Sequence, residues 1–239
     1  MEFDEQLIPQ MSLGLSLNNG FQFSNFFATE STLLLLAALK NIAEQPSDDF
    51  ILVSGSEQSG KTHLLLATYH RAQQFQINSG YLPLEEFVQY SPEDSLTIYA
   101  DTSLLLIDGV EHVANDKEWQ KALFDLYNRR KDAGLATVFT IRSSIVLFEG
   151  IQLNDLKTRL TACLNFQIPE FSDKELVAFL EFTASARGLI LNQQCMQFII
   201  LRAGRSQQSL FNIVEQLDRA QLSVGRRITV PFIKALFHW

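Results

Sequence analysis

Apolar runs alternate with amphipathic stretches along the chain from about residue 21 to residue 168. The apolar runs predict strands at 50–53, 80–84, 104–107, 136–141 and 164–168. Apolar residues that recur at i, i+3, i+4 and i+7 predict helices at 31–45, 61–75 and 117–132. Because strands and helices alternate, we expect an α/β fold in which helices cover both faces of a mostly parallel sheet.

In the remaining chain the strand pattern ends and only helical periodicity continues. It predicts helices at 173–187, 192–203, 206–222 and 230–238. Ser172 stands three residues before Glu175, which is the spacing of a capping box at a helix start. The beginning of the chain has no sustained period. We therefore expect a flexible arm at 1–20, an α/β subdomain at 21–170 and an all-helical subdomain at 171–239.

The composition limits the ways in which the protein can meet nucleic acid. The 239 residues are 46% hydrophobic, enough for one or two globular domains. There are 19 Lys and Arg residues against 27 Asp and Glu residues, a formal net charge of -8. A protein that binds DNA unaided neutralises phosphates with basic side chains, so we expect contact with DNA only indirectly, through a partner.

The sequence favours a cytoplasmic protein without membrane contact. Residues 1–5 are acidic where a signal peptide is basic, and the densest apolar run, 33–39, is far shorter than a membrane span. Cys163 and Cys195 are too isolated for a disulfide framework or a zinc site, and the histidines have neither metal spacing nor triad spacing. We expect both thiols to be buried.

The most specific motif lies between the predicted strand 50–53 and the predicted helix 61–75. It has the pattern G-x-x-x-x-G-K-T, and its residues are Gly55, Ser56, Glu57, Gln58, Ser59, Gly60, Lys61 and Thr62. In such a loop, backbone N–H groups point at phosphate oxygens, and the start of the helix adds its positive end. We expect ATP or ADP to bind here, with Lys61 beside the outer phosphates and Thr62 as a ligand of Mg²⁺.

Asp108 directly follows the apolar strand 104–107. By itself an Asp at a strand end is often only a turn former. Beside a phosphate loop, however, its carboxylate is suited to hold magnesium. We therefore expect Asp108 and Thr62 to share the Mg²⁺ of the bound nucleotide.

Together the phosphate loop, the strand that ends in Asp108 and the helical C-terminal part resemble an AAA+ P-loop NTPase core with a helical lid. Residues 23–27 are similar to the segment that opens the nucleotide-binding domain of DnaA. Other short blocks are similar to the Hda branch of the DnaA/Hda family, at 124–129, 217–220 and 229–234. The likeness covers nearly the whole chain, and it implies that Phe26 and Phe27 lie near the adenine.

The resemblance implies a role in the control of bacterial DNA replication, at the replisome. The initiator DnaA continues into a C-terminal domain that reads DNA, whereas this sequence ends at Trp239. The Hda branch acts with the DNA-loaded sliding clamp, the beta subunit of DNA polymerase III, to promote hydrolysis of ATP bound to DnaA. We expect the same inhibition of re-initiation here, with DnaA and the clamp as partners.

Residues 10–15 resemble the Q-L-S/D-L-x-L peptides that dock in the hydrophobic groove of the clamp. In such a peptide the glutamine forms hydrogen bonds at one end of an extended strand, and apolar side chains fill the groove. The residues that carry this expectation are Gln10, Met11, Ser12, Leu13 and Leu15. Gly14 departs from the proline often found at its position, which would weaken the affinity.

Arg159 matches the position where proteins of this branch offer an arginine to a neighbour's nucleotide. A fixed guanidinium beside the γ-phosphate stabilises charge in the transition state. The resemblance therefore implies that Arg159 is an arginine finger that acts in trans. An arginine on a helix is otherwise most often a partner in a surface ion pair.

Several positions depart from the pattern of an active AAA+ ATPase. Gly109 stands where such enzymes commonly carry an acid that activates water. Gln208 replaces the lid arginine that senses nucleotide, and Arg205 lies one helical turn earlier, where it could partly compensate. Residues 140–143 offer no clean match to the polar residue that senses the γ-phosphate. We expect weak or no intrinsic turnover, with nucleotide, ADP in particular, as a structural ligand.

Two other functions stay open. The chain could be a self-sufficient AAA+ ATPase, such as a helicase-loading or clamp-loading factor, with Glu111 in place of the missing acid. Gly109 and Gln208 argue against this alternative. The chain could also be a DNA-binding fragment of an initiator, which its charge disfavours. The sequence decides neither between ADP and ATP nor whether the protein forms a homo-oligomer.

Overall fold

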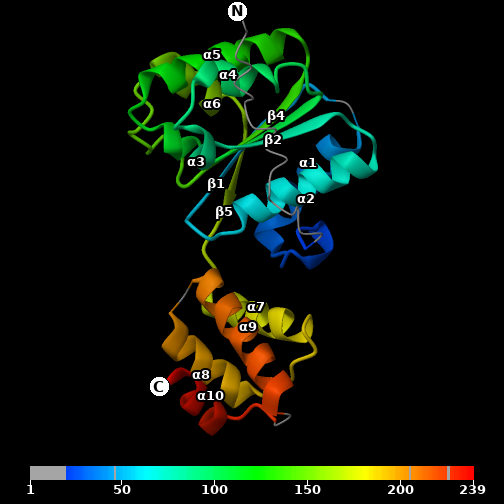
Figure 1. Ribbon diagram of the computed structural model, residues 1–239, viewed down its shortest axis with the longest axis vertical. Coiled ribbons are helices and arrows are strands. Elements are labelled where there is room, and N and C mark those ends of the chain that lie inside the picture. Colours follow the sequence, from blue (N-terminus) through cyan, green and yellow to red (C-terminus); the bar gives the residue numbers. More distant parts are fainter. Residues whose placement is uncertain (1–19, 46, 205, 225–226) are drawn as a thin grey trace, which may run out of the picture. The chain divides into compact units, whose positions relative to one another are not determined.

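The computed structural model of the protein describes residues 20–45, 47–204, 206–224 and 227–239 (Figure 1). The described chain packs as two compact units. The first contains Thr32–Ser54 and Gly60–Gln167 with the described residues up to Phe26, and the second contains Phe27–Ser31, Gly55–Ser59 and Ile168–Trp239. Within these residues, no helix has the length and apolar character that crossing a bilayer requires. The division into 1–20, 21–170 and 171–239 stays a prediction.

The first unit is built around a five-stranded sheet. Its strands are β1 (Phe50–Gly55), β2 (Ser79–Pro83), β3 (Leu104–Asp108), β4 (Ala136–Ile141) and β5 (Leu164–Ile168). They lie in the order β2-β3-β4-β1-β5, and β1 pairs in parallel with β4, β4 with β3 and β3 with β2. β1 and β4 are buried along their whole length, as expected of strands covered on both faces. The predicted α/β fold is confirmed.

Helices lie on both faces of this sheet (Figure 1). One layer contains α1 (Leu33–Glu44) and α2 (Lys61–Gln74), and the other contains α4 (Pro92–Thr97), α5 (Lys117–Asp132) and α6 (Asn154–Thr161). Shorter elements are η1 (Phe23–Asn25), η2 (Glu30–Thr32), α3 (Leu84–Phe87) and η3 (Val110–Val113). Periodicity predicted α1, α2 and α5 correctly. It did not predict α3, α4 or α6, because 4, 6 and 8 residues are too few to display a clear helical period.

The sequence of α5 determines both its start and its buried face. Asp116 caps the helix by accepting hydrogen bonds from the backbone N–H groups of Glu118 and Trp119, both at 3.0 Å. The predicted apolar stripe faces the sheet, and its buried members are Trp119, Leu123, Leu126 and Tyr127. Burial of this stripe is what fixes α5 on the sheet.

The second unit contains the predicted helical region. Its helices are α7 (Asp173–Ser185), α8 (Gln193–Ala203), α9 (Gln207–Val224) and α10 (Val230–Phe237). The predicted capping box is present, because the Ser172 N–H donates to Glu175 Oε2 at 2.9 Å and the Glu175 N–H donates to Ser172 Oγ at 3.4 Å. Apolar side chains from all of these helices form a separate core, among them Leu180, Ile199, Leu217 and Ile233.

Both cysteine thiols are free and buried, Cys163 in the first unit and Cys195 in the second. Burial raises the pKa of the Cys163 thiol to about 12, so the thiol stays protonated at neutral pH. Each cysteine packs within the apolar core of its own unit, as predicted.

Arg130 is fully buried beneath the amino ends of β3 and β4. Its guanidinium donates to the carbonyl oxygens of Thr102 at 2.9 Å and Ala136 at 2.5 Å, and to Thr137 Oγ1 at 2.8 Å. Burial lowers the pKa of Arg130 to about 10, against the opposing effect of the negative charge on Asp101, and the group stays charged at neutral pH. A single side chain thus binds the segments that lead into two neighbouring strands.

We predict that Arg130→Met lowers the free energy of unfolding by about 3 kcal/mol or more, because it leaves several buried carbonyl groups without a donor. Urea unfolding followed by circular dichroism measures the change. Arg129→Met is the matched control, since Arg129 is exposed on the same helix and should change stability by less than about 0.5 kcal/mol. Equal stability of the two variants would contradict the role given to Arg130.

Candidate nucleotide site

The candidate site lies at the carboxyl edge of the sheet, where neighbouring strands end together. β1 runs into the phosphate loop, β3 ends at Asp108, and β4 carries Thr140 near its end. The parallel register places Val53 of β1 opposite Thr140. Strand order and register therefore bring the end of β1, Asp108 and Thr140 to the edge of the sheet where α/β proteins bind ligands.

Gly60 marks the passage from the phosphate loop into α2. Its φ of +93° lies in the left-handed region, and a Cβ at this position would stand 2.9 Å from Cε2 of Phe26. Lys61 begins α2 and is buried, whereas Thr62 is exposed. The start of α2 brings backbone N–H groups and the positive end of the helix dipole to the loop, as a phosphate site requires.

Three hydroxyl groups donate hydrogen bonds to the carboxylate of Asp108. Thr62 Oγ1 and Tyr81 Oη donate to Oδ2 at 2.7 and 2.9 Å, and Thr140 Oγ1 donates to Oδ1 at 2.5 Å. The backbone N–H of Gly109 donates to Thr140 Oγ1 at 2.8 Å, which directs the Thr140 proton toward Asp108. We call Thr62, Tyr81 and Thr140 the hydroxyl cluster.

The sequence prediction for this site contained Thr62 and Asp108 but neither Tyr81 nor Thr140. Tyr81 lies on β2, and it reaches Asp108 only because β2 pairs with β3. Polar residues within otherwise apolar strands are the signal that could have found both. Burial and the negative charge of Asp108 raise the pKa of the Tyr81 hydroxyl well above its usual range, so it remains a donor at neutral pH.

Asp108 and Thr62 are suited to hold Mg²⁺. A carboxylate oxygen and a hydroxyl oxygen that lie 2.7 Å apart are the hard oxygen donors that this ion prefers. In the described part of the chain, no group of three or more His, Cys, Asp or Glu side chains is arranged to hold a metal ion. A magnesium site at Asp108 would therefore depend on this one carboxylate, the Thr62 hydroxyl and the phosphates of the nucleotide.

Gly109 adopts a left-handed conformation with φ +80°, and a Cβ there would stand 2.5 Å from Cδ2 of His112. An acidic side chain at this position would be strained by the left-handed backbone and would collide with the His112 ring. Glu111 follows in η3, and its Oε2 accepts a hydrogen bond from the backbone N–H of Arg142 at 3.1 Å. Glu111, the first acid after Gly109, thus holds the segment after β4.

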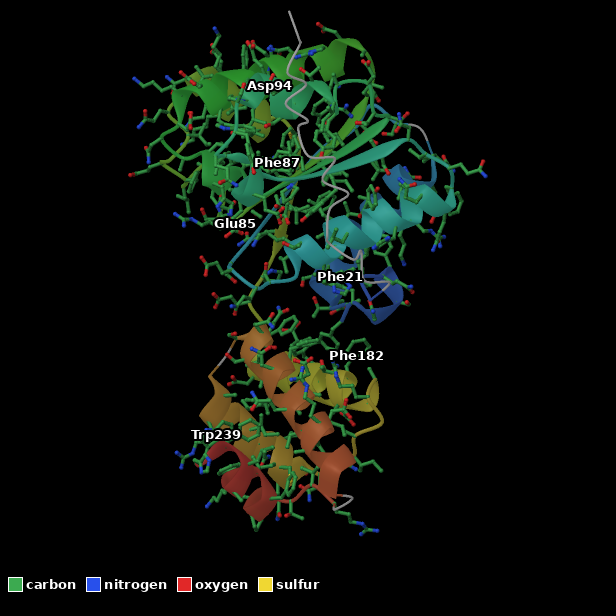
Figure 2. The ribbon with its side chains drawn as sticks, viewed as in Figure 1. Phe21, Glu85, Phe87, Asp94, Phe182 and Trp239 are labelled. Atoms are coloured by element: carbon green, nitrogen blue, oxygen red, sulfur yellow. The ribbon has the colours of Figure 1, made fainter. Side chains whose placement is uncertain are left out.

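The two phenylalanines predicted near the adenine lie in different environments. Phe26 packs against His63 of α2, with ring centroids 5.5 Å apart, and Phe21, labelled in Figure 2, packs on the same ring at 5.3 Å. Phe27 instead joins an aromatic cluster of the second unit, with centroids 5.5 Å from Phe171 and from Phe182. In the first unit Phe26 therefore lies beside Gly60 at the start of α2, whereas Phe27 packs in the second unit.

Within the second unit, the phosphate loop meets the start of α9. Ser206 Oγ donates to Oε1 of Gln58 at 2.9 Å, and the backbone N–H of Ser209 donates to Ser206 Oγ at 3.1 Å. Ser206 was not among the predicted site residues. Gln208 is exposed and its amide donates to Asn212 at 2.8 Å. Arg205 lies outside the described residues.

Arg159 lies on α6 with its side chain exposed. Its guanidinium carbon is 5.9 Å from the ring centroid of Tyr127, which is a cation–π distance. Ion pairs in the described residues join Arg71 to Glu44, Lys131 to Asp48 and Arg219 to Glu215. None of the described carboxylates pairs with Arg159. Within the described residues, the alternative role of Arg159 as a partner in a surface ion pair is therefore not observed.

The predicted clamp-binding residues lie outside the described part of the chain. They are Gln10, Met11, Ser12, Leu13 and Leu15. Their role stays a prediction, as do the roles assigned to the phosphate loop, Asp108, Gln208 and Arg159.

Two family models match the chain. The model described as the bacterial DnaA ATPase domain matches residues 17–167, and the model described as the Hda lid domain matches residues 173–237. The two matches together cover the α/β core and the helical region that follows it.

Solved structures share the fold at low sequence identity. Domain III of the replication initiation protein DnaA from Thermotoga maritima is 18% identical with a TM-score of 0.78, over 92% of this chain and 97% of that one. AMPPCP-bound DnaA from Aquifex aeolicus is 20% identical with a TM-score of 0.74, over 88% and 69%. The T. maritima RuvB branch migration motor is 16% identical with a TM-score of 0.69, over 91% and 71%.

We predict that His63 makes stability depend on pH below about 6.5. Burial lowers the pKa of His63, against the opposing effect of the Gln22 carbonyl oxygen at 3.0 Å. The folded state then binds fewer protons than the unfolded state, so stability is full above the unfolded pKa and is lost as pH falls through the lower folded pKa.

Thermal unfolding at pH 7.5 and pH 5.5 tests this, with His63→Gln as the variant that cannot titrate. From pH 7.5 to pH 5.5, the melting temperature of the wild type should fall further than that of His63→Gln. Equal losses in both proteins would show that His63 does not cause the dependence.

Proposed function

Because this chain belongs to the DnaA/Hda family of AAA+ proteins, we propose that it restrains replication initiation by promoting hydrolysis of ATP bound to DnaA. The match of residues 173–237 to the Hda lid favours this regulator over an initiator within the family. The observation that carries the proposal is the exposed guanidinium of Arg159, which has no ion pair among the described residues. A cation in that state is available to a partner's phosphates.

In the proposed mechanism, Arg159 faces the γ-phosphate of the ATP that DnaA holds. Negative charge on the phosphoryl oxygens must be stabilised in the transition state, and the planar guanidinium can donate two parallel hydrogen bonds to them. Docking removes water from around Arg159, which strengthens the interaction. The Tyr127 ring 5.9 Å away supports the side chain from below, so less conformational freedom is lost on docking.

We assign a structural role to the protein's own nucleotide, ADP or ATP. Lys61 and the phosphate loop would hold its phosphates, and Thr62 with Asp108 would hold Mg²⁺, which neutralises phosphate charge. The AMPPCP bound in DnaA from Aquifex aeolicus supports nucleotide binding by this fold. Gly109 has no side chain to activate water, and Glu111 is engaged with the backbone of Arg142. The protein would therefore hold nucleotide without turning it over rapidly.

The clamp would supply the second half of the mechanism. A peptide at residues 10–15 that binds the clamp's hydrophobic groove would tether the protein to DNA-loaded clamps. Tethering raises the effective concentration of Arg159 near DnaA molecules on the same DNA. With a net charge of -8, the protein would depend on the clamp to reach DNA.

We predict that Arg159→Ala abolishes the stimulation of DnaA ATP hydrolysis, a loss of about 10³-fold or more in the stimulated rate. The measurement is release of phosphate from ATP-bound DnaA in the presence of DNA-loaded clamp and this protein. Arg159→Lys keeps the charge but not the planar fork, and it should recover only a small part of the rate.

Arg202→Ala is the matched control for this experiment. Arg202 is also exposed and also lies over an aromatic ring, 5.8 Å from the centroid of Phe198. The Arg202→Ala variant should stimulate ATP hydrolysis by DnaA to the same extent as the wild type. Full stimulation by Arg159→Ala would remove the finger assignment, and ATP turnover by the isolated protein at about 1 s⁻¹ or faster would favour a self-sufficient ATPase.

We predict that changing Gln10 and Leu13 together to Ala lowers stimulation on DNA-loaded clamp by about 10²-fold, because the tether is lost. Surface plasmon resonance with immobilised clamp measures binding directly, and the hydrolysis assay measures the consequence. The control changes Gln6 and Leu17 to Ala, the same residue types outside the motif. If both double variants bind the clamp as the wild type does, the docking motif lies elsewhere.

A further inference from the structure

β2 contributes one polar side chain to the carboxyl edge of the sheet. The parallel register places Tyr81 opposite Leu106 and Pro83 opposite Asp108. Because alternate residues of a strand share a face, Tyr81 and Asp108 lie on the same face, two positions apart along the strands. The Tyr81 side chain spans this offset and brings its hydroxyl to 2.9 Å from Asp108 Oδ2.

The position of the Tyr81 hydroxyl is fixed by the core. The residue is only 6% exposed, so its ring cannot swing away into solvent without disrupting its packing. Thr62, the other donor to Oδ2, is exposed at the start of α2. Tyr81 and Thr62 both donate to Asp108 Oδ2, and of these two hydroxyl groups that of Tyr81 is therefore the one held in place by packing.

A carboxylate oxygen offers two lone-pair directions. At Asp108 Oδ2, Tyr81 occupies one of them and Thr62 occupies the other. Thr140 holds the second oxygen, Oδ1, at 2.5 Å. Together, Tyr81 and Thr140 fix the rotation of the carboxylate, so that the remaining direction of Oδ2 points at Thr62.

We infer that Tyr81 is a positioning residue for Mg²⁺: it aims Asp108 Oδ2 at Thr62 and thereby couples binding of the metal to binding of the nucleotide. This inference rests on the proposed binding of nucleotide at the phosphate loop. Residues that orient a metal-ligating group by hydrogen bonding commonly contribute 10- to 100-fold, as an order of magnitude, to metal affinity. A role in packing alone would need the Tyr81 ring but not its hydroxyl.

The test separates the hydroxyl from the ring with Tyr81→Phe. Affinity for ADP is measured by isothermal titration calorimetry in excess Mg²⁺ and again in EDTA, and the ratio of the two affinities gives the gain from Mg²⁺. In Tyr81→Phe we expect this gain to fall by about tenfold or more, with the affinity in EDTA unchanged. Melting temperatures in EDTA without nucleotide check that the variant is folded.

Tyr99→Phe is the matched control. Tyr99 is a partly buried tyrosine of the first unit, and its ring packs against Phe87 at a centroid distance of 6.5 Å. Its variant should keep the full gain from Mg²⁺. A wild-type gain in Tyr81→Phe, or an equal loss of affinity with and without Mg²⁺, would overturn the inference and leave the proposed nucleotide binding intact. Failure of the wild type to bind ADP would overturn the nucleotide-bound state itself.

Discussion

The parallel pairing of β3, β4 and β1 is the constraint on which the candidate site depends. It brings the end of β1, Asp108 and Thr140 to one edge of the sheet. A slip of β4 by one residue would turn Thr140 to the opposite face and remove the donor to Asp108 Oδ1. At the other end of the same strands, Arg130 binds the carbonyl oxygens of Thr102 and Ala136. A core arginine and a carboxylate with its hydroxyl donors thus hold the same strands from opposite ends.

The local features could be predicted from the sequence, and the features that depend on strand order could not. Each run predicted as a strand is a strand in the structure, and the stripe of α5 is its buried face, because hydrophobic period is a local property. The phosphate loop was predicted from the spacing of its residues, and Asp108 from its place at the end of an apolar strand beside that loop. Tyr81 was missed because its partner is Asp108, and only the pairing of β2 with β3 joins them. Phe26 and Phe27 are adjacent in sequence, but their side chains pack in different units.

Burial determines which groups are available to bind the guanidinium of Arg130 and that of Arg159. Arg130 is enclosed, and the oxygens around its guanidinium come from the protein's own strands. Arg159 is exposed over the Tyr127 ring, and in the described structure no carboxylate pairs with it. The first charge is compensated within the fold, so it cannot serve a partner. The second charge has no such compensation among the described residues, so in the proposed mechanism it can serve a partner's phosphates.

The backbone at Gly109 determines how easily an acidic side chain could be placed next to Asp108. The left-handed conformation and the His112 ring together disfavour an acidic side chain at this position. A mutation that supplied the carboxylate would therefore also need a rearranged turn and a displaced imidazole. A variant with the acid but without these changes would be strained at this turn. An acid at this position is therefore disfavoured by the shape of the chain as well as missing from the sequence.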